Sequence, residues 1–255
     1  GDPITNKYKK ISLQINEMAT INYIKRVYTK ENASKFIFIS TCSNYGLSKN
    51  KHLNENHKLK PLSPYAKSKV KIEKFILKLK RKKAFSPTIL RFATAFGFSN
   101  RMRYDLTINE FTKDLYLKKY LEIYDFNTWR PYCHVKDFAR LIEIIIFSKK
   151  NLTDYQIFNV GSNKNNYTKK SIGTKIKKLI GGKIKFLKKS KDKRNYVVDF
   201  SKVKKILKFK PKYSVEYGIK EIINKIKKEK KNNKNYDKLG NYKIIVKQWL
   251  IFILL

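Results

Sequence analysis

Apolar residues recur along the chain at two spacings, one typical of helices and one typical of strands. In residues 11–28, for example, Ile11, Ile15 and Met18 fall on one helical face, whereas FIFIS at 36–40 is a short apolar strand. The predicted helices are 11–28, 63–81, 109–118, 135–147, 167–180, 201–207 and 215–228, and the predicted strands are 36–40, 88–92, 121–124, 156–160 and 184–187. Because the two kinds of element alternate, we predict an α/β fold with a mostly parallel sheet.

Turn and capping residues support several of these boundaries. Ser63 followed by Pro64 is a typical helix start, with Ser as the N-cap and Pro in the first turn. Gly161 ends the strand predicted at 156–160. Gly181-Gly182 ends the helix predicted at 167–180. These signals indicate an ordered chain up to about residue 229.

The last part of the chain has a different pattern. It is polar and aperiodic from about residue 230 and ends in the apolar run WLIFILL at 249–255. This run is too short to span a membrane. It can dock on the core, touch a membrane surface, or come from coding that continues past a normal end, and the sequence leaves these alternatives open. We therefore expect three parts, at 1–100, 101–229 and 230–255.

The composition is that of a folded protein. Hydrophobic residues make up 42% of the chain and aromatic residues 14%, which excludes a disordered chain. The two cysteines, Cys42 and Cys133, give neither a disulfide framework nor a zinc spacing, and no metal site is predicted. The chain has neither a secretory signal nor an apolar run of about 18 residues, so we expect a cytoplasmic protein without a membrane partner.

The charge is strongly positive, with 60 Lys and Arg against 19 Asp and Glu and a formal net charge of +41. Such a charge can indicate binding to nucleic acid or to an anionic membrane. However, only eight of the 60 cations are Arg, the residue that base and phosphate recognition favours, and the lysines are spread along the chain. The pattern favours drift toward residues with A/T-rich codons over selection for nucleic-acid binding.

The main chemical signal is a Tyr and a Lys four residues apart, Tyr65 and Lys69, on the helix predicted at 63–81. This spacing puts both side chains on one helical face. An ammonium near a phenol stabilises the phenolate and lowers its pKa from about 10, so that Tyr65 becomes a usable acid/base. In a chain with 17 Tyr and many Lys, the plain alternative is a surface pair that arose by chance.

Hydroxyl side chains follow the strand predicted at 36–40. Thr41 and Ser43 lie where the carboxyl end of a parallel strand is expected, which is where α/β sheets bind ligands. Thr41 can therefore bind the same hydroxyl that Tyr65 deprotonates. The alternative is that both hydroxyls cap the turn.

Five segments in the same order resemble one known family. They are STCSNYG at 40–46, SPYAKSK at 63–69, LRFATAFG at 90–97, RPYCHVKD at 130–137 and FNVG at 158–161. Together they resemble the extended short-chain dehydrogenases/reductases, the NAD-dependent epimerases and dehydratases of nucleotide sugars that include UDP-glucose 4-epimerase. The resemblance covers about residues 1–228.

The resemblance implies a fold, a cofactor and partners. The fold is an incomplete Rossmann-type doubly wound parallel sheet, formed by 1–100 with strands returning near 131–160, followed by a smaller C-terminal substrate-binding α/β part. The cofactor is NAD and the substrate a nucleotide sugar. The family also implies a homodimer through the helices at 11–28 and 63–81.

Individual catalytic and cofactor roles follow from the same resemblance. Thr41 matches the Ser/Thr that hydrogen-bonds the sugar hydroxyl, Tyr65 matches the catalytic acid/base, and Lys69 matches the residue that holds both the Tyr and the nicotinamide ribose. Asn16 matches a cofactor-contacting Asn. Ala93 stands where the family contacts the nicotinamide end through the backbone.

Substrate contacts are implied further along the chain. Thr94 stands where epimerases usually carry an Asn toward the substrate diphosphate, and Arg130 matches the Arg that binds this diphosphate. The alternative for Arg130 is a structural ion pair. Asp192 and Tyr196 resemble the nucleotide-binding segment, and Arg194 between them can bind phosphate.

Two departures from the family pattern limit what is expected. Dehydratases carry Asp-Glu where this chain has Cys42-Ser43, which favours epimerisation or keto-reduction over dehydration. The nine glycines include no G-x-x-G-x-x-G turn, and the first residues resemble the segment after the family's fourth strand. We therefore expect an N-terminally truncated chain that binds NAD weakly or not at all and is inactive by itself.

Several functions remain open at this stage. The first is an NAD-dependent epimerase that acts on a nucleotide sugar with Tyr65 as acid/base. A dehydratase or ketoreductase of the same family is the closest alternative. A non-catalytic remnant and a basic binding protein are the alternatives outside enzymology.

Overall fold

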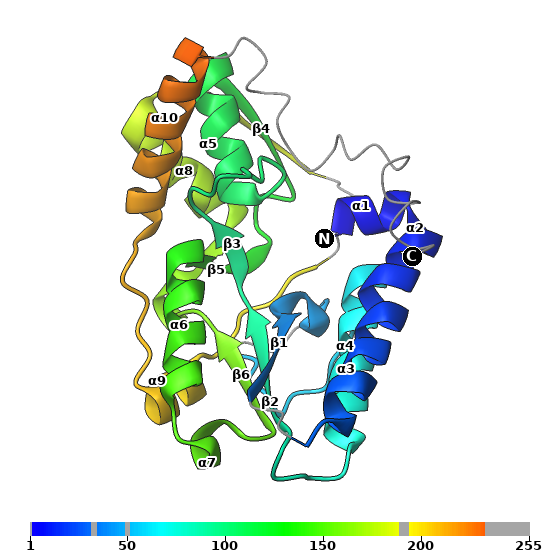
Figure 1. Ribbon diagram of the computed structural model, residues 1–255. Helices are drawn as coiled ribbons and strands as arrows, with labels where there is room; N and C mark the ends of the chain where they lie inside the picture. Colours follow the sequence, from blue (N-terminus) through cyan, green and yellow to red (C-terminus); the bar gives the residue numbers. More distant parts are fainter. Residues whose placement is uncertain (1, 32–34, 49–51, 189–193, 233–255) are drawn as a thin grey trace.

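The computed structural model describes residues 2–31, 35–48, 52–188 and 194–232 (Figure 1). The α-helices are α1 (Asp2–Lys7), α2 (Lys9–Leu13), α3 (Thr20–Thr29), α4 (Pro64–Lys78), α5 (Thr107–Lys118), α6 (Val135–Phe147), α7 (Lys150–Thr153), α8 (Lys169–Ile180), α9 (Ser201–Leu207) and α10 (Val215–Asn232). The strands are β1 (Lys35–Thr41), β2 (Ser86–Phe92), β3 (Thr94–Phe96), β4 (Tyr120–Tyr124), β5 (Trp129–His134), β6 (Gln156–Val160), β7 (Asn166–Thr168) and β8 (Lys183–Leu187). A π-helical segment η1 (Gln14–Ala19) and two 3₁₀ turns, η2 (Cys42–Tyr45) and η3 (Asn163–Asn165), complete the chain.

The main sheet has three parallel strands in the order β1-β2-β6. Thr41 pairs with Phe92, and Phe92 pairs with Val160, so the carboxyl ends of the three strands lie side by side. The predicted α/β class and the parallel pairing are therefore confirmed. This common edge is where side chains that follow the strands converge.

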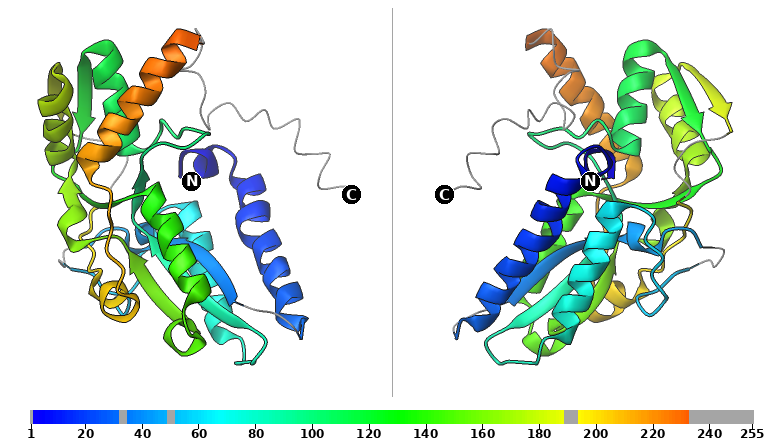
Figure 2. Two further views of the ribbon diagram at one scale, coloured as in Figure 1. Left: turned by 60° about the vertical axis from the view of Figure 1, so that its left-hand side comes forward. Right: turned by 90° about the vertical axis from the view of Figure 1, so that its right-hand side faces the viewer.

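Helices cover both faces of the main sheet. On one face, Ile24 of α3 and Ile72 and Ile76 of α4 pack with Phe38 and Ile89. On the other face, buried side chains of α6 and α9 pack against β2 and β6; they are Phe138, Leu141, Ile145, Val203, Leu207, Leu90, Phe158 and Val160. In the right-hand view of Figure 2, α3 in blue runs beside α4 in cyan, and the two helices are in contact.

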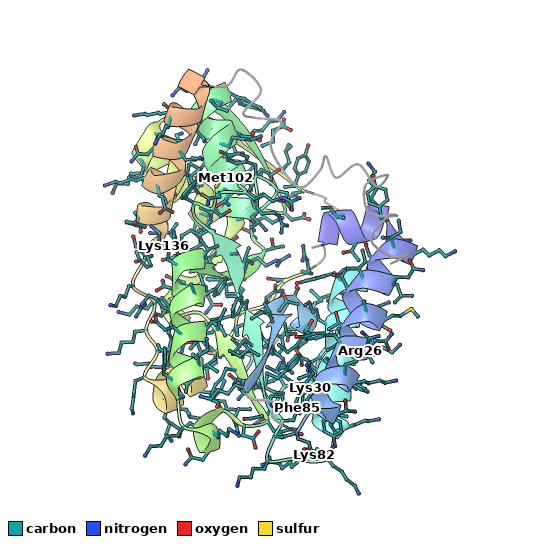
Figure 3. The ribbon with its side chains drawn as sticks, in the orientation of Figure 1. Arg26, Lys30, Lys82, Phe85, Met102 and Lys136 are labelled. Carbon is teal, nitrogen blue, oxygen red and sulfur yellow. The ribbon has the colours of Figure 1, made fainter. Side chains whose placement is uncertain are left out.

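Aromatic rings pack together at the amino-terminal ends of β1 and β2, opposite to the end of the sheet where the cavity-facing side chains converge. The ring of Phe85, just before β2, lies 5.5 Å from the rings of Tyr28 and Phe36, measured between centroids. Figure 3 labels Phe85 near Lys82, whose ammonium lies 4.2 Å from the Tyr28 ring centroid. These contacts attach the end of α3 to the sheet.

A second group of elements forms the smaller part of the fold. Strands β3, β5 and β7 form one sheet and β4 and β8 form a parallel pair. These strands and the helices α5, α8 and α10 share one apolar core, which includes Phe96, Ile108, Leu115, Ile123, Tyr132, Ile176 and Ile219. Figure 1 shows this group above the main sheet. Within 131–160, β6 lies in the main sheet and β5 pairs with β3 and β7, so the expected domain division stays a prediction.

Some elements differ from the sequence-based expectation. The single helix predicted at 11–28 is interrupted by η1, a wider turn in which buried Glu17 pairs with Lys71 of α4. Strands β3, β5 and β7 were not predicted. β3 and β7 have three residues each, and β5 is buried on both sides and contains Pro131, so none shows an alternating pattern.

Candidate active site

The turn after β1 presents two hydroxyl groups. Thr41 is the N-cap of η2, and its Oγ1 accepts a hydrogen bond from the Ser43 amide at 3.1 Å. The two hydroxyl oxygens also lie 2.6 Å apart and share a hydrogen bond. Both residues line a cavity at the end of the main sheet. The turn-capping role and the proposed ligand-facing role of Thr41 are therefore compatible.

Helix α4 brings a phenol and an ammonium to the same place. Ser63 is its N-cap, accepting from the Ala66 amide at 3.1 Å, so Tyr65 falls in the first turn and Lys69 one turn later. The Lys69 Nζ donates to the Ile39 carbonyl of β1 at 2.7 Å and lies 5.8 Å from the Tyr65 ring centroid. Burial lowers the pKa of Lys69 to about 8, partly opposed by the negative charge of Glu73. The Lys69 ammonium is thus partly desolvated beside the phenol.

The cavity at the strand ends, called here the strand-end cavity, has a volume of about 320 Å³. Seven of the residues expected at a site line it, namely Thr41, Tyr65, Ala93, Thr94, Arg130, Arg194 and Tyr196. They come from β1, α4, the β2–β3 junction, β5 and the segment after β8. Lys69 does not line the cavity directly, but it binds the carbonyl of Ile39, which does.

One wall of the strand-end cavity is cationic. Arg130 is 5% exposed, and its Nη1 donates to the Trp129 carbonyl at 2.7 Å. Its guanidinium carbon lies 5.1 Å from the ring centroid of Tyr196. Arg194 lines the cavity as well. The packing on Tyr196 restricts the orientation of the Arg130 guanidinium, which adds a fixed positive charge to this wall.

Two further cations that were not expected from the sequence, Arg103 and Lys169, also line this cavity. Arg103 forms a two-point ion pair with Asp105, with distances of 2.7 Å from Nε to Oδ1 and 2.6 Å from Nη2 to Oδ2. Burial alone would raise the pKa of Asp105, but the bonds and charge of Arg103 outweigh it and lower this pKa. Neither residue lies in a recognisable motif, so only the folded arrangement reveals them.

A second cavity of about 510 Å³ adjoins the first. The two share Asp105, Thr107, Lys169 and Arg194 in their linings. The rest of the second cavity is lined by α5 and β4 and includes the carboxylates Glu110, Asp114 and Glu122. The shared lining residues place the two cavities next to each other.

Two expected site residues lie elsewhere. Asn16 is on η1 and does not belong to the lining of either cavity. Asp192 lies outside the described residues. Across residues 2–31, 35–48, 52–188 and 194–232, no group of three or more His, Cys, Asp and Glu side chains could hold a metal ion.

A parallel sheet with helices on both faces and a cavity at its strand ends is a Rossmann-type α/β fold. The model of the NAD dependent epimerase/dehydratase family matches residues 1–161 of the chain. The chain belongs to this family. The expected resemblance is therefore confirmed.

Known relatives cover much of the chain. A UDP-glucuronate 4-epimerase of Thermodesulfobacterium geofontis is 32% identical over 195 residues, which is 74% of this chain and 58% of that protein. An uncharacterized protein of Methanocaldococcus jannaschii is 29% identical over 222 residues, 83% of this chain and 64% of that protein. The chain thus spans less than two thirds of the length of these relatives.

Solved structures are similar in fold. A UDP-glucuronic acid 4-epimerase from Bacillus cereus, in complex with UDP-glucuronic acid and NAD, has a TM-score of 0.73 and 25% identity over 85% of this chain and 68% of that chain. A UDP-glucose 4-epimerase from Thermotoga maritima with UDP-glucose has a TM-score of 0.75 and 23% identity over 89% of this chain and 74% of that chain. Among the described helices, none is long and apolar enough to cross a bilayer.

Proposed function

We propose that this chain carries the substrate-binding face and the acid/base residues of an NAD-dependent nucleotide-sugar epimerase. The observation that supports this most directly is the strand-end cavity, which gathers the Thr41 hydroxyl, the Tyr65 phenol and the Arg130 guanidinium from elements far apart in the sequence. Hydroxyl and phenol groups suit a sugar, and guanidinium groups suit a diphosphate. The adjoining cavity leaves room for the nucleoside.

The proton-transfer step rests on Tyr65, Lys69 and Thr41. The phenolate oxygen of Tyr65 accepts the proton of a sugar hydroxyl, while the Thr41 hydroxyl hydrogen-bonds that hydroxyl and fixes its direction. The Lys69 ammonium stabilises the phenolate through its charge. The reverse transfer returns the proton when the sugar carbonyl is reduced again.

NAD, when bound, supplies the acceptor for the hydride that leaves the sugar carbon. The residues present fit its nicotinamide end, because Lys69, Tyr65 and Ala93 meet beside the cavity. The glycines of the described segments occupy separate turns and helix contacts, and no glycine-rich phosphate turn occurs among them. Tight NAD binding therefore needs groups other than the glycines described.

The two residues that follow Thr41, Cys42 and Ser43, favour epimerisation or keto-reduction over dehydration. Cys42 is 1% exposed, and its thiol donates to the Arg91 carbonyl in the apolar core. Burial raises the pKa of the Cys42 thiol. Ser43 faces the cavity but is a poor acid. Neither residue provides the carboxyl pair that removing a sugar hydroxyl requires.

A homodimer through the first helices and α4 is also proposed. Leu13, Met18 and Tyr23 are 46%, 55% and 61% exposed on the first helical segments, and Leu77 of α4 is 43% exposed. Exposed apolar side chains on two adjacent helices are typical of a protein–protein interface.

Calorimetric titration of the chain with UDP-glucose and UDP-glucuronate tests the proposal. We expect saturable binding that Arg130→Gln weakens by about tenfold to a hundredfold, because a hydrogen bond to a charged group contributes about 1.5–3 kcal/mol. The matched control is Arg26→Gln, since Arg26 is exposed on α3 (Figure 3). A parallel fluorescence titration with NADH measures cofactor binding. No sugar-nucleotide binding at millimolar concentration would contradict the proposal.

A further inference from the structure

Three side chains on α4 repeat at intervals of four residues and face the end of β1. Tyr65 and Lys69 are the acid/base pair of the proposed function, and Glu73 comes one turn later. Glu73 is 2% exposed, which is rare for a carboxylate that is not paired. Its position on the same face as Lys69 connects it to the site without bringing it into the cavity lining.

The Glu73 carboxylate binds three other parts of the fold. Its Oε1 accepts from the Ser40 hydroxyl at 2.5 Å and from the Asn44 amide at 2.9 Å. Its Oε2 accepts from Arg91 Nη2 at 2.7 Å and Nε at 3.1 Å. One buried carboxylate therefore joins α4 to the last residues of β1, to the η2 turn and to β2.

Arg91 extends this connection across the sheet. It is 3% exposed, and its Nη1 donates to the Tyr45 hydroxyl at 3.2 Å and to the Glu55 carbonyl at 3.1 Å. The Tyr45 hydroxyl in turn lies 2.8 Å from Asn159 Oδ1 on β6. Every strand of the main sheet is thus tied to α4 through Glu73 and Arg91.

We propose that Glu73 is a positioning residue for the Tyr65–Lys69 pair, because its carboxylate fixes α4 against the strand end and the turn that carry Thr41 and Ser43. The inference rests on the proposed function. Ser40 precedes Thr41, and Asn44 follows Ser43, so the two donors to Glu73 flank the hydroxyls of the cavity. Lys69 is attached to the same strand at Ile39.

Glu73 also acts on Lys69 through its charge. The carboxylate raises the pKa of Lys69 against the larger effect of burial, which lowers it. Loss of a buried ion pair elsewhere in the core would not have this effect on Lys69. The charge state of Lys69 is therefore a readout that is specific to the link between Glu73 and the acid/base pair.

The test measures the pKa of Lys69 in the chain by trace labelling with acetic anhydride at a series of pH values, followed by peptide mass spectrometry. Exposed Lys67 on the same helix is the internal reference. In Glu73→Gln we expect the labelling midpoint of Lys69 to fall by about one pH unit, since a nearby opposite charge is lost. Glu73→Asp, which keeps the charge, should return the midpoint toward that of the unmodified chain.

The matched control is Asp137→Asn on α6. Asp137 is also fully buried and paired, with Arg140 at 2.6 Å, so its loss destabilises a comparable ion pair without affecting Lys69. If Glu73→Gln does not fold, the double variant Glu73→Gln/Arg91→Gln replaces it, because it leaves no unpaired buried charge. An unchanged Lys69 midpoint in the folded variant would overturn the inference. Labelling needs neither NAD nor a sugar nucleotide, so this outcome is distinct from failure of the proposed function.

Discussion

The Nε2 of buried His134 lies 3.0 Å from Oε2 of Glu221, joining the end of β5 to α10. The His134 Nδ1 accepts from the Lys136 amide at 3.2 Å, so the neutral ring donates its one proton from Nε2 to Glu221. Lys136, labelled in Figure 3, adds a bond to Glu221 Oε1 at 2.5 Å. Through Lys136 of α6, Glu221 also links the helix that covers the main sheet to the smaller part of the fold, and these contacts form the junction between the two parts.

Stability should fall in acid because of this junction. Burial lowers the pKa of His134 below its ordinary 6.5, outweighing the opposing attraction of Glu221. The unfolded chain therefore binds the proton first, and stability is lost as the pH falls below about 6.5, with a slope of at most about 1.4 kcal/mol per pH unit from this group. Urea unfolding at pH 8 to 5 measures the slope. The His134→Gln variant should have a lower free energy of unfolding than the unmodified chain at pH 8, but this free energy should fall less between pH 6.5 and 5. If it falls equally in both proteins, His134 is not the group that causes the loss of stability in acid.

Removing the Tyr65 hydroxyl should abolish proton transfer and leave binding intact. Tyr65→Phe keeps the ring that lines the strand-end cavity, so we expect unchanged affinity for UDP-sugars. The rate of epimerisation is measured by proton NMR of the sugar with NAD, in the chain fused behind a glycine-rich NAD-binding segment, and should fall by about a hundredfold to ten-thousandfold. Tyr217→Phe, at an exposed tyrosine outside the linings of both cavities, is the control. A Tyr65→Phe variant with an unchanged rate would assign the acid/base role elsewhere.

The start of β1 stabilises the end of α6 through a lysine. Lys35 Nζ donates to the carbonyls of Ile145 at 2.6 Å and Ile146 at 2.8 Å, and also to that of Ser148. A cation suits the carboxyl end of a helix dipole. Lys35→Met should lower the free energy of unfolding by about 1–3 kcal/mol in urea titrations. Lys67→Met, at an exposed position on α4, should change it by much less.

The proposed dimer predicts a change of mass in solution. Met18→Glu puts a charge on the exposed apolar face of the first helices, so light scattering after size exclusion should detect monomers instead of dimers. Phe147→Glu is the control, because Phe147 is 83% exposed at the end of α6. If both variants keep the mass of the unmodified chain, the interface lies elsewhere or does not form.

Local sequence patterns predicted the regular elements well. The helix at 135–147, the strand at 156–160 and the helix at 201–207 are confirmed with their bounds. Their apolar periodicity and their caps act within one element, so a sequence displays them directly. The interruption of the first helix by η1 was missed, because the apolar spacing does not show where a helix widens, and the pairing of Glu17 in this turn with Lys71 is made to another helix.

The sequence by itself determined that Tyr65 and Lys69 share one helical face, since their spacing equals about one turn. Only the tertiary structure decided what meets them. The order β1-β2-β6 brings Thr41 level with Phe92, and the pairing of β3 with β5 brings Thr94 level with Tyr132, on the strand that carries Arg130. Strand order and register depend on contacts between residues far apart in the chain, and the buried bonds of Glu73 with Arg91 likewise join two separate elements, α4 and β2.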